Sequence, residues 1–160
     1  MQQYALIGGF AVSAWGIPRA TQDIDFAIAV GSADPLALAT FLNARYQGGE
    51  PGDPLHGVLQ VTIKTGQGSV SLQLIILPAA LTELVFSHVV SLSVLNCTVP
   101  VVSWQMLVIL KLYAGGPQDM IDVQQILKVR RPNAEEVQAI SSMAETAGVL
   151  DEWKELSRKL

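Results

Sequence analysis

The chain has 160 residues, of which 50% are apolar and 15% are charged, and its formal net charge is −4. Intrinsic disorder is excluded, because a disordered chain has few apolar residues and a high net charge. The acidic balance argues against a protein that holds nucleic acid by bulk electrostatics, since that requires clustered Lys and Arg. Sequence-specific or transient contact with RNA stays open. The length fits one compact unit with a single core.

The single cysteine and the hydropathy bear on location. Cys97 has no second cysteine for a disulfide or a structural zinc site, which indicates a reducing, cytoplasmic compartment. We expect its side chain to lie in the core, because free cysteines are usually buried. The mean hydropathy of +0.38 prompts a search for a membrane span. The longest apolar stretch, residues 99–110, is broken by polar residues and a proline, so no membrane contact is expected.

The first hundred residues mix strand and helix patterns. Residues 23–30 alternate apolar side chains with aspartates and alanines, and this period of two predicts a strand. Asp34 followed by Pro35 predicts the start of a helix that runs to about Tyr46. A Gly/Pro-rich loop covers residues 48–54. The other predicted elements are strands over 4–7, 58–64 and 70–77, extended segments within 88–102, and helices over 10–15 and 78–86.

The last sixty residues show helix patterns alone. Ser103 predicts the cap of a helix over 104–114, which ends at Gly115. Further helices are predicted over 117–128, from Asn133 to Gly148, and over 150–159. The sequence therefore predicts an α+β fold. A mixed β-sheet with flanking helices occupies residues 1–102, and a helical C-terminal extension over 103–160 packs on it as part of one compact unit.

Three features of the first 25 residues converge on one place in this fold. Gly8 and Gly9 precede a predicted helix, where backbone N–H groups can reach a phosphate, although the same pair also fits an ordinary turn. Asp23 and Asp25 lie two apart on a strand, with Cα atoms about 6.6 Å apart on one face, which suits a single hard cation such as Mg²⁺. A solvent-facing strand end is the alternative for this pair.

The segment ALIGGFAVSAWGIPRATQDID (residues 5–25) resembles the signature of nucleotidyltransferases of the DNA polymerase β superfamily. In that signature a Gly-Gly or Gly-Ser turn and a helix are followed by an Arg-x-Thr-x-x-Asp-x-Asp strand. Residues 99–114 and 118–122 are similar to the Lys-containing and Asp-containing helices of the small AbiEii-like nucleotidyltransferases. Many of those are toxin components of toxin–antitoxin or abortive-infection systems. The resemblance covers residues 4–127.

The resemblance implies a nucleotidyltransferase-like fold and transfer of a nucleoside monophosphate from an NTP to an acceptor, with Mg²⁺ as the metal and pyrophosphate as the product. The acceptor class stays open among RNA, a protein hydroxyl and a small molecule, and a separate antitoxin chain is a possible partner. The implied roles are triphosphate cradling by Gly8, Gly9 and Phe10, metal binding by Asp23 and Asp25, and phosphate contact by Lys111, with Asp119 beside the site.

Arg19 and Thr21 follow the first helix of this motif and are expected at the nucleotide. Arg19 has two interpretations, a clamp on a phosphate or neutralisation of Asp23 and Asp25. Lys111 stands alone in an apolar helix, so it either contacts phosphate or extends from a buried helix to water. Asp119 also suits the first turn of a helix on electrostatic grounds alone. Asp122 is expected at the surface or as a partner of Lys111.

The chain departs from the family pattern at the third metal-binding position. Gln73 stands where a third carboxylate is usual, and its amide oxygen can ligate a metal but cannot take a proton. Asp53, Glu50 or His56 in the nearby loop are candidate substitutes. The second hypothesis is therefore a non-catalytic nucleotide-binding or protein-interaction module. The third is a structural subunit whose apolar surface makes a homo-oligomer.

Overall fold

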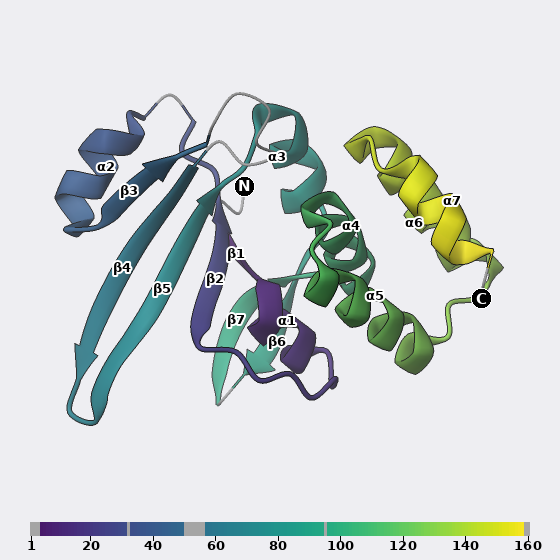
Figure 1. The fold of residues 1–160 in the computed structure, drawn as a ribbon, viewed down its shortest axis with the longest axis horizontal. Coiled ribbons are helices and arrows are strands. Elements are labelled where there is room, and N and C mark those ends of the chain that lie inside the picture. Colours follow the sequence, from purple (N-terminus) through teal and green to yellow (C-terminus); the bar gives the residue numbers. More distant parts are fainter. Residues whose placement is uncertain (1–3, 32, 50–56, 95, 159–160) are drawn as a thin grey trace.

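The computed structural model describes residues 4–31, 33–49, 57–94 and 96–158. These residues form a seven-stranded mixed sheet in the order β3-β4-β5-β2-β1-β7-β6, with seven helices around it (Figure 1). The predicted α+β class, a mixed sheet with flanking helices, is confirmed. The strands are β1 (Tyr4–Ile7), β2 (Asp23–Ile28), β3 (Arg45–Gly48), β4 (Gly57–Thr65), β5 (Gly68–Ile76), β6 (Val89–Val94) and β7 (Cys97–Val102).

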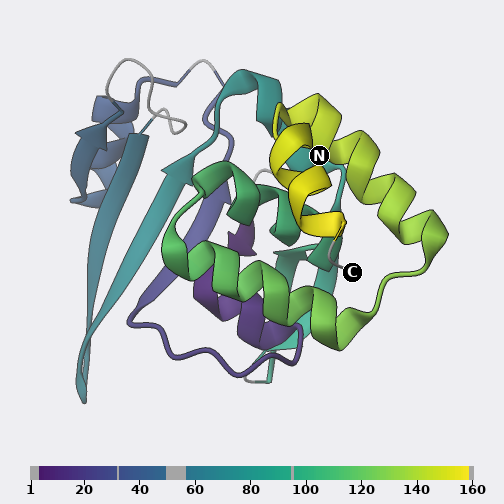
Figure 2. The same ribbon diagram turned by 45° about the vertical axis from the view of Figure 1, so that its right-hand side comes forward.

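The helices lie on both sides of this sheet. Their bounds are α1 (Gly8–Ala14), α2 (Pro35–Leu42), α3 (Ala79–Phe86), α4 (Trp104–Ala114), α5 (Pro117–Arg130), α6 (Ala134–Ala147) and α7 (Leu150–Ser157). Figure 2 shows α1, α4 and α5 in front of the sheet and α2 behind its β3–β4 end. Among the residues just described, no helix has both the length and the apolar character that a bilayer crossing requires.

Strand pairing brings the aspartate strand to the middle of the sheet. β2 pairs antiparallel with β1 and parallel with β5, so it is hydrogen-bonded on both edges. The strands predicted over 58–64 and 70–77 are β4 and β5, which pair antiparallel as a hairpin that closes at the pair between Thr65 and Gly68. Because successive side chains of a strand alternate between faces, one face of β2 carries Asp23 and Asp25, and the other packs its apolar side chains.

Capping side chains start several helices where the sequence predicts them. Asp34 accepts a hydrogen bond from the Leu36 N–H, and Ser103 accepts one from the Met106 N–H at the start of α4. Asn133 and Glu136 form a reciprocal capping box at the start of α6. These local hydrogen bonds define the N-terminal ends of α2, α4 and α6 independently of long-range packing.

A main core joins the sheet to the C-terminal helices. It runs from Ala5 and Val12 through the buried side chains of α4 to Trp153 of α7, which is 1% exposed. A second, smaller cluster of Ala39, Leu59 and Ile76 fixes α2 to the opposite side of the sheet. The helix α4 is buried over most of its length and packs against α1, α5 and α6.

Three local predictions were wrong. The helix from Pro35 ends at Leu42, because Asn43 adopts the left-handed conformation, which Asn tolerates, and ends the helix; the next residues pair with β4 as the edge strand β3. The first helix begins at Gly8, two residues earlier than expected. Cys97 is exposed, since it belongs to the last pair at the tip of the β6–β7 hairpin.

Candidate functional site

The Gly8–Gly9 turn makes room for the side chains of the aspartate strand. Gly8 has φ +65°, and a Cβ added there would overlap the carboxylate of Asp25. A Cβ on Gly9 would lie 2.9 Å from the Cβ of Thr21, closer than real Cβ contacts allow. Both glycines are therefore needed for the close approach of the segment that carries Thr21 and Asp25.

Asp25 lies at the centre of a cross-strand row. Its register partners are Ile7 on β1 and Gln73 on β5, and Asp23 pairs with Ser71 in the same way. Directly paired residues of neighbouring strands project to the same face, so the Gln73 amide is beside the Asp25 carboxylate. Gln60 of β4 is the next residue of this row, opposite Gln73. The position expected for a third carboxylate is thus next to Asp25, and an amide occupies it.

The carboxylate of Asp25 is unusually hard to ionise. Its pKa is raised from the ordinary value of 3.8 to about 6, chiefly by burial and also by the like charge of Asp23. Lys111 and a hydrogen bond from the Gly9 backbone N–H lower the pKa but do not cancel these effects. A cation beside Asp23 and Asp25 would favour the ionised form of Asp25, because its charge would offset the repulsion between the two carboxylates.

A cavity of about 340 Å³ opens beside Asp25, between the sheet and α4. Its lining combines polar and charged residues with apolar ones. The polar and charged residues and the two glycines of the lining are Gly8, Gly9, Arg19, Thr21, Asp25, Lys111 and Asp119. The apolar and aromatic residues of the lining are Ile7, Ile75, Leu77, Leu81, Leu107, Leu110, Tyr113 and Ala114.

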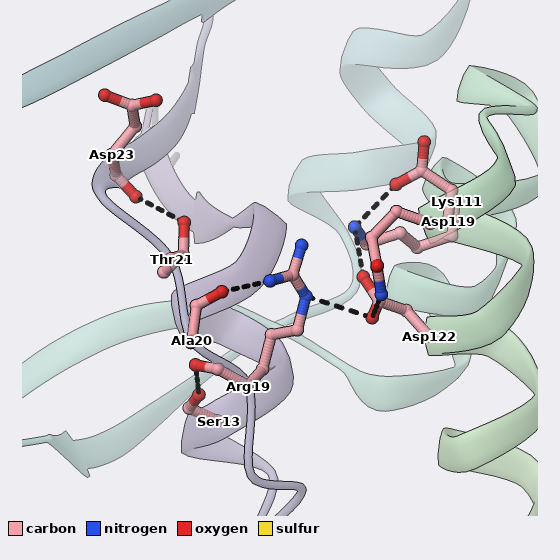
Figure 3. A network of polar contacts seen from close by, with 9 residues as sticks. Ser13, Arg19, Ala20, Thr21, Asp23, Lys111, Asp119 and Asp122 are labelled. Carbon is pink, nitrogen blue, oxygen red and sulfur yellow. Dashed lines mark hydrogen bonds and ion pairs between the residues drawn. The ribbon is translucent and has the colours of Figure 1, made fainter.

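Lys111 and Arg19 are held on one wall of this cavity by carboxylates of α5. The Lys111 Nζ lies 2.6 Å from the Asp119 Oδ1 and 2.8 Å from the Asp122 Oδ2. The Arg19 Nε donates to the Asp122 Oδ1 over 3.2 Å. Figure 3 shows Asp122 between the two cations, with the Asp23 side chain turned away from them. Two positive charges from distant segments thus face one cavity.

The structure gathers most of the predicted site residues but not all of them. Gly8, Gly9, Arg19, Thr21, Lys111 and Asp119 line the cavity together with Asp25. Phe10, Asp23 and Gln73 are not among its lining residues. Phe10 is half-buried in α1, whereas Asp23 and Gln73 share the face of Asp25 outside the cavity wall. The loop candidates Glu50, Asp53 and His56 lie outside the described residues.

The contacts settle several alternatives. Lys111 does not extend to water, because it is 8% exposed and its Nζ is bound by two carboxylates. The expectation of a surface position for Asp122 is wrong, since this residue is 0% exposed, and its pairing with Lys111 is confirmed. Arg19 forms its ion pair with Asp122. Among the described residues it has no ion pair with Asp23 or Asp25, so these contacts do not support the interpretation that Arg19 neutralises those two aspartates.

The link between Arg19 and Asp122 is the feature that sequence reasoning missed. The two residues are 103 positions apart, so no local spacing connects them. A signal was present in the three-residue interval between Asp119 and Asp122, which places both on one side of a helix that follows the Lys111 helix. That interval predicts a second acid facing the lysine, and only the fold brings Arg19 to it.

Replacement of Gly8 tests the fit between the turn and the aspartate. Gly8→Ala places a Cβ in the Asp25 carboxylate, whereas Gly16→Ala is a matched control with φ +86° and no atom within 4 Å. Both changes cost about 1–2 kcal/mol for the left-handed backbone. We expect Gly8→Ala alone to weaken Mn²⁺ binding, at least tenfold, in an equilibrium titration followed by electron paramagnetic resonance. Equal Mn²⁺ affinity in the two variants contradicts this fit.

Comparison with known proteins bears on the fold. No protein-family model matches the chain, and no curated protein matches it in sequence. Several solved structures are similar to it, including the following three. An antigenic nucleotidyltransferase-like protein from Paracoccidioides brasiliensis is 19% identical, with a TM-score of 0.51 over 97% of this chain and 82% of its own. ANT(2")-Ia, solved with adenylyl-2"-tobramycin, is 13% identical, with a TM-score of 0.53 over 91% and 87%.

JHP933 from Helicobacter pylori is the third, at 16% identity and a TM-score of 0.53 over 99% of this chain and 84% of its own. At these identities the likeness is one of fold. The chain therefore has a nucleotidyltransferase-like fold, and what it does has to be argued from its own site.

Proposed function

We propose that this protein is a Mg²⁺-dependent nucleotidyltransferase that moves a nucleoside monophosphate from an NTP to an acceptor and releases pyrophosphate. The observation that carries the proposal is the cavity itself, whose lining combines the charged side chains of Asp25, Arg19 and Lys111 with apolar side chains. A nucleoside triphosphate likewise combines charged phosphates with a flat, weakly polar base. The charged lining residues suit its phosphates, and the apolar ones suit its base.

The donor set fits one divalent cation held jointly with the nucleotide. Mg²⁺ is commonly bound by one or two carboxylates plus substrate phosphates, and Asp23 and Asp25 offer two on one face of β2. Within the described part of the chain, no group of three or more His, Cys, Asp or Glu side chains gathers to hold a metal without a ligand. When bound, the ion would neutralise charge on the phosphate oxygens during transfer.

The other residues of the cavity have distinct expected roles. Arg19 and Lys111 contribute positive charge for the phosphates, and the Gly8–Gly9 turn leaves space because it has no side chains. Asp25 and Asp119 line the same cavity, and Asp122 pairs with Lys111 beside them, so carboxylates outnumber cations and an NTP without a divalent cation would be repelled. Leu110 and Tyr113 offer apolar surface to the base.

The acceptor would approach from the side of the aspartates that faces β5. Ser71 and Gln73 are the register partners of Asp23 and Asp25 there, outside the cavity lining. An RNA end, a protein hydroxyl and a small molecule are the candidate acceptors. ANT(2")-Ia, with its adenylyl-2"-tobramycin, is a similar fold solved with an adenylylated small molecule. A toxin-type role with a cognate antitoxin rests on the sequence resemblance to AbiEii-like proteins.

Gln73 favours a second candidate, a non-catalytic nucleotide-binding module. An amide beside Asp25 cannot accept the proton of an attacking hydroxyl. Release of pyrophosphate from Mg²⁺-NTPs, assayed with each acceptor class in turn, separates the two candidates. The proposal predicts release that depends on one acceptor and is absent in Asp23→Asn/Asp25→Asn. Binding of Mg²⁺-NTP without release for any class supports the non-catalytic module instead.

A further inference from the structure

Asp122 is the most deeply buried ionisable side chain of the site, and the roles assigned above do not use it. It is 0% exposed in the middle of α5. Its Oδ1 accepts hydrogen bonds from the Arg19 Nε over 3.2 Å and from the Gln118 Nε2 over 3.0 Å, and its Oδ2 lies 2.8 Å from the Lys111 Nζ. One carboxylate thus joins the loop after α1 to the helices α4 and α5.

We propose that Asp122 is a positioning residue that holds the Arg19 and Lys111 cations together on the cavity wall, aimed at the phosphates of the nucleotide. This inference rests on the proposed function, because Arg19 and Lys111 matter only if a phosphate chain enters the cavity. Asp122 contacts neither nucleotide nor metal in this scheme. It acts through the two side chains that it binds.

The contacts leave donors on both cations for a ligand. The Lys111 ammonium has three N–H groups, and two carboxylates engage it, at Asp119 and Asp122. The Arg19 guanidinium donates from Nε to Asp122 and from one terminal nitrogen to the backbone oxygen of Ala20. Among the described residues, its second terminal nitrogen makes no hydrogen bond, and Arg19 lines the cavity (Figure 3). Each cation thus keeps at least one donor that these contacts do not use.

A carboxylate suits this place and an amide does not. Asp122 offers acceptors only, and its two oxygens divide between two cations. An asparagine would turn an NH₂ group toward either Arg19 or Lys111, so one of the two cations would lose its contact with residue 122, and Lys111 would keep only Asp119. Lys and Arg side chains have many rotamers, and a cation without an anchor must be ordered again when the phosphates bind.

Charge alone predicts the opposite result. Removing a negative charge from behind a phosphate site reduces the repulsion of the ligand and would tighten its binding. Positioning predicts weaker binding, because the cations lose their arrangement. The sign of the change therefore separates the two accounts.

Calorimetric titration with Mg²⁺-tripolyphosphate measures this sign without any acceptor or base. We expect Asp122→Asn to weaken binding at least tenfold. The matched control is Gln118→Ala, which removes a hydrogen bond to the same carboxylate but no cation, and we expect it to change Kd less than threefold. Unchanged or tighter binding in Asp122→Asn overturns the inference. Absence of binding by the wild type overturns the proposed function, and this inference with it.

A second variant keeps the test decisive if Asp122→Asn fails to fold. Arg19 is partly exposed on a loop, and Arg19→Lys keeps its charge while removing the Nε contact with Asp122. We expect this variant to bind Mg²⁺-tripolyphosphate at least fivefold more weakly than the wild type. Wild-type affinity in Arg19→Lys overturns the role of Asp122 in orienting Arg19.

A double-mutant cycle gives a readout that a merely structural role would leave unchanged. In an Arg19→Gln background, the weakening caused by Asp122→Asn should shrink at least threefold, because one of the two positioned cations is gone. If Asp122→Asn weakens binding by the same factor in the wild type and in Arg19→Gln, Asp122 does not act by positioning Arg19. Thermal unfolding of every variant confirms that the proteins compared are folded.

Discussion

Asp25→Asn is expected to stabilise the metal-free protein at pH 7 while it removes binding of the Mg²⁺-nucleotide. The folded protein holds the pKa of Asp25 at about 6, above its ordinary 3.8, through burial and the charge of Asp23. The unfolded chain therefore loses this proton at lower pH than the folded chain. Stability contributed by protonated Asp25 is complete below pH 4, falls between pH 4 and 6, and is absent at pH 7.

Replacing the charge with an amide removes this penalty. A pKa shift of two units corresponds to about 3 kcal/mol at most, and solvent screening of this partly exposed carboxylate reduces the expected gain to about 1 kcal/mol. Urea unfolding in EDTA measures the difference in free energy of unfolding between Asp25→Asn and the wild type. We expect the variant to be more stable at pH 7 and equally stable at pH 4. Asp34→Asn is the control, because Asn is an equally good helix cap. A variant less stable than the wild type at pH 7 contradicts the electrostatic account of this strand.

Gln73→Asp is expected to raise the rate of pyrophosphate release at least tenfold. The new carboxylate would lie beside Asp25 on the same face, where it adds a metal ligand and a proton acceptor. It would also add a third like charge, so the metal-free protein should unfold more readily at pH 7. Electron paramagnetic resonance of bound Mn²⁺ should show tighter binding than in the wild type.

The matched control for this change is Gln60→Asp. Gln60 is opposite Gln73 on β4, one strand further from Asp25, so the same charge is added at a greater distance. We expect little change in transfer rate from it. If Gln73→Asp leaves both the rate of pyrophosphate release and the Mn²⁺ affinity unchanged, the amide at this position limits neither catalysis nor metal binding.

Much of the sheet and of the site was predictable because the signals are local. The period of two in β2 places Asp23 and Asp25 on one face, and the hairpin glycines align β4 with β5. The signature carried by Gly8 to Asp25 predicted that the turn and the aspartates meet, although the reason for the two glycines came from the structure. Their missing Cβ atoms make space for Thr21 and Asp25.

The failures arose where tertiary contacts override local preference. Residues 44–46 continue a helical pattern, yet Asn43 turns the chain and the Tyr46 ring packs against the small core of α2 and β4. Cys97 is apolar in character, but its place at a hairpin tip leaves it uncovered. The pairing of Arg19 with Asp122 depends on α5 lying against the loop that follows α1, which no short sequence window contains.

Calorimetric titration of each Mg²⁺-NTP into the wild type and into Asp23→Asn/Asp25→Asn tests the central claim most directly. The site predicts saturable binding of at least one Mg²⁺-NTP by the wild type, loss of that binding in EDTA, and affinity at least a hundredfold weaker in the double variant. Equal binding by both proteins would place the nucleotide away from the two aspartates. Absence of binding of any Mg²⁺-NTP by the folded wild type would contradict a nucleotide site in this cavity.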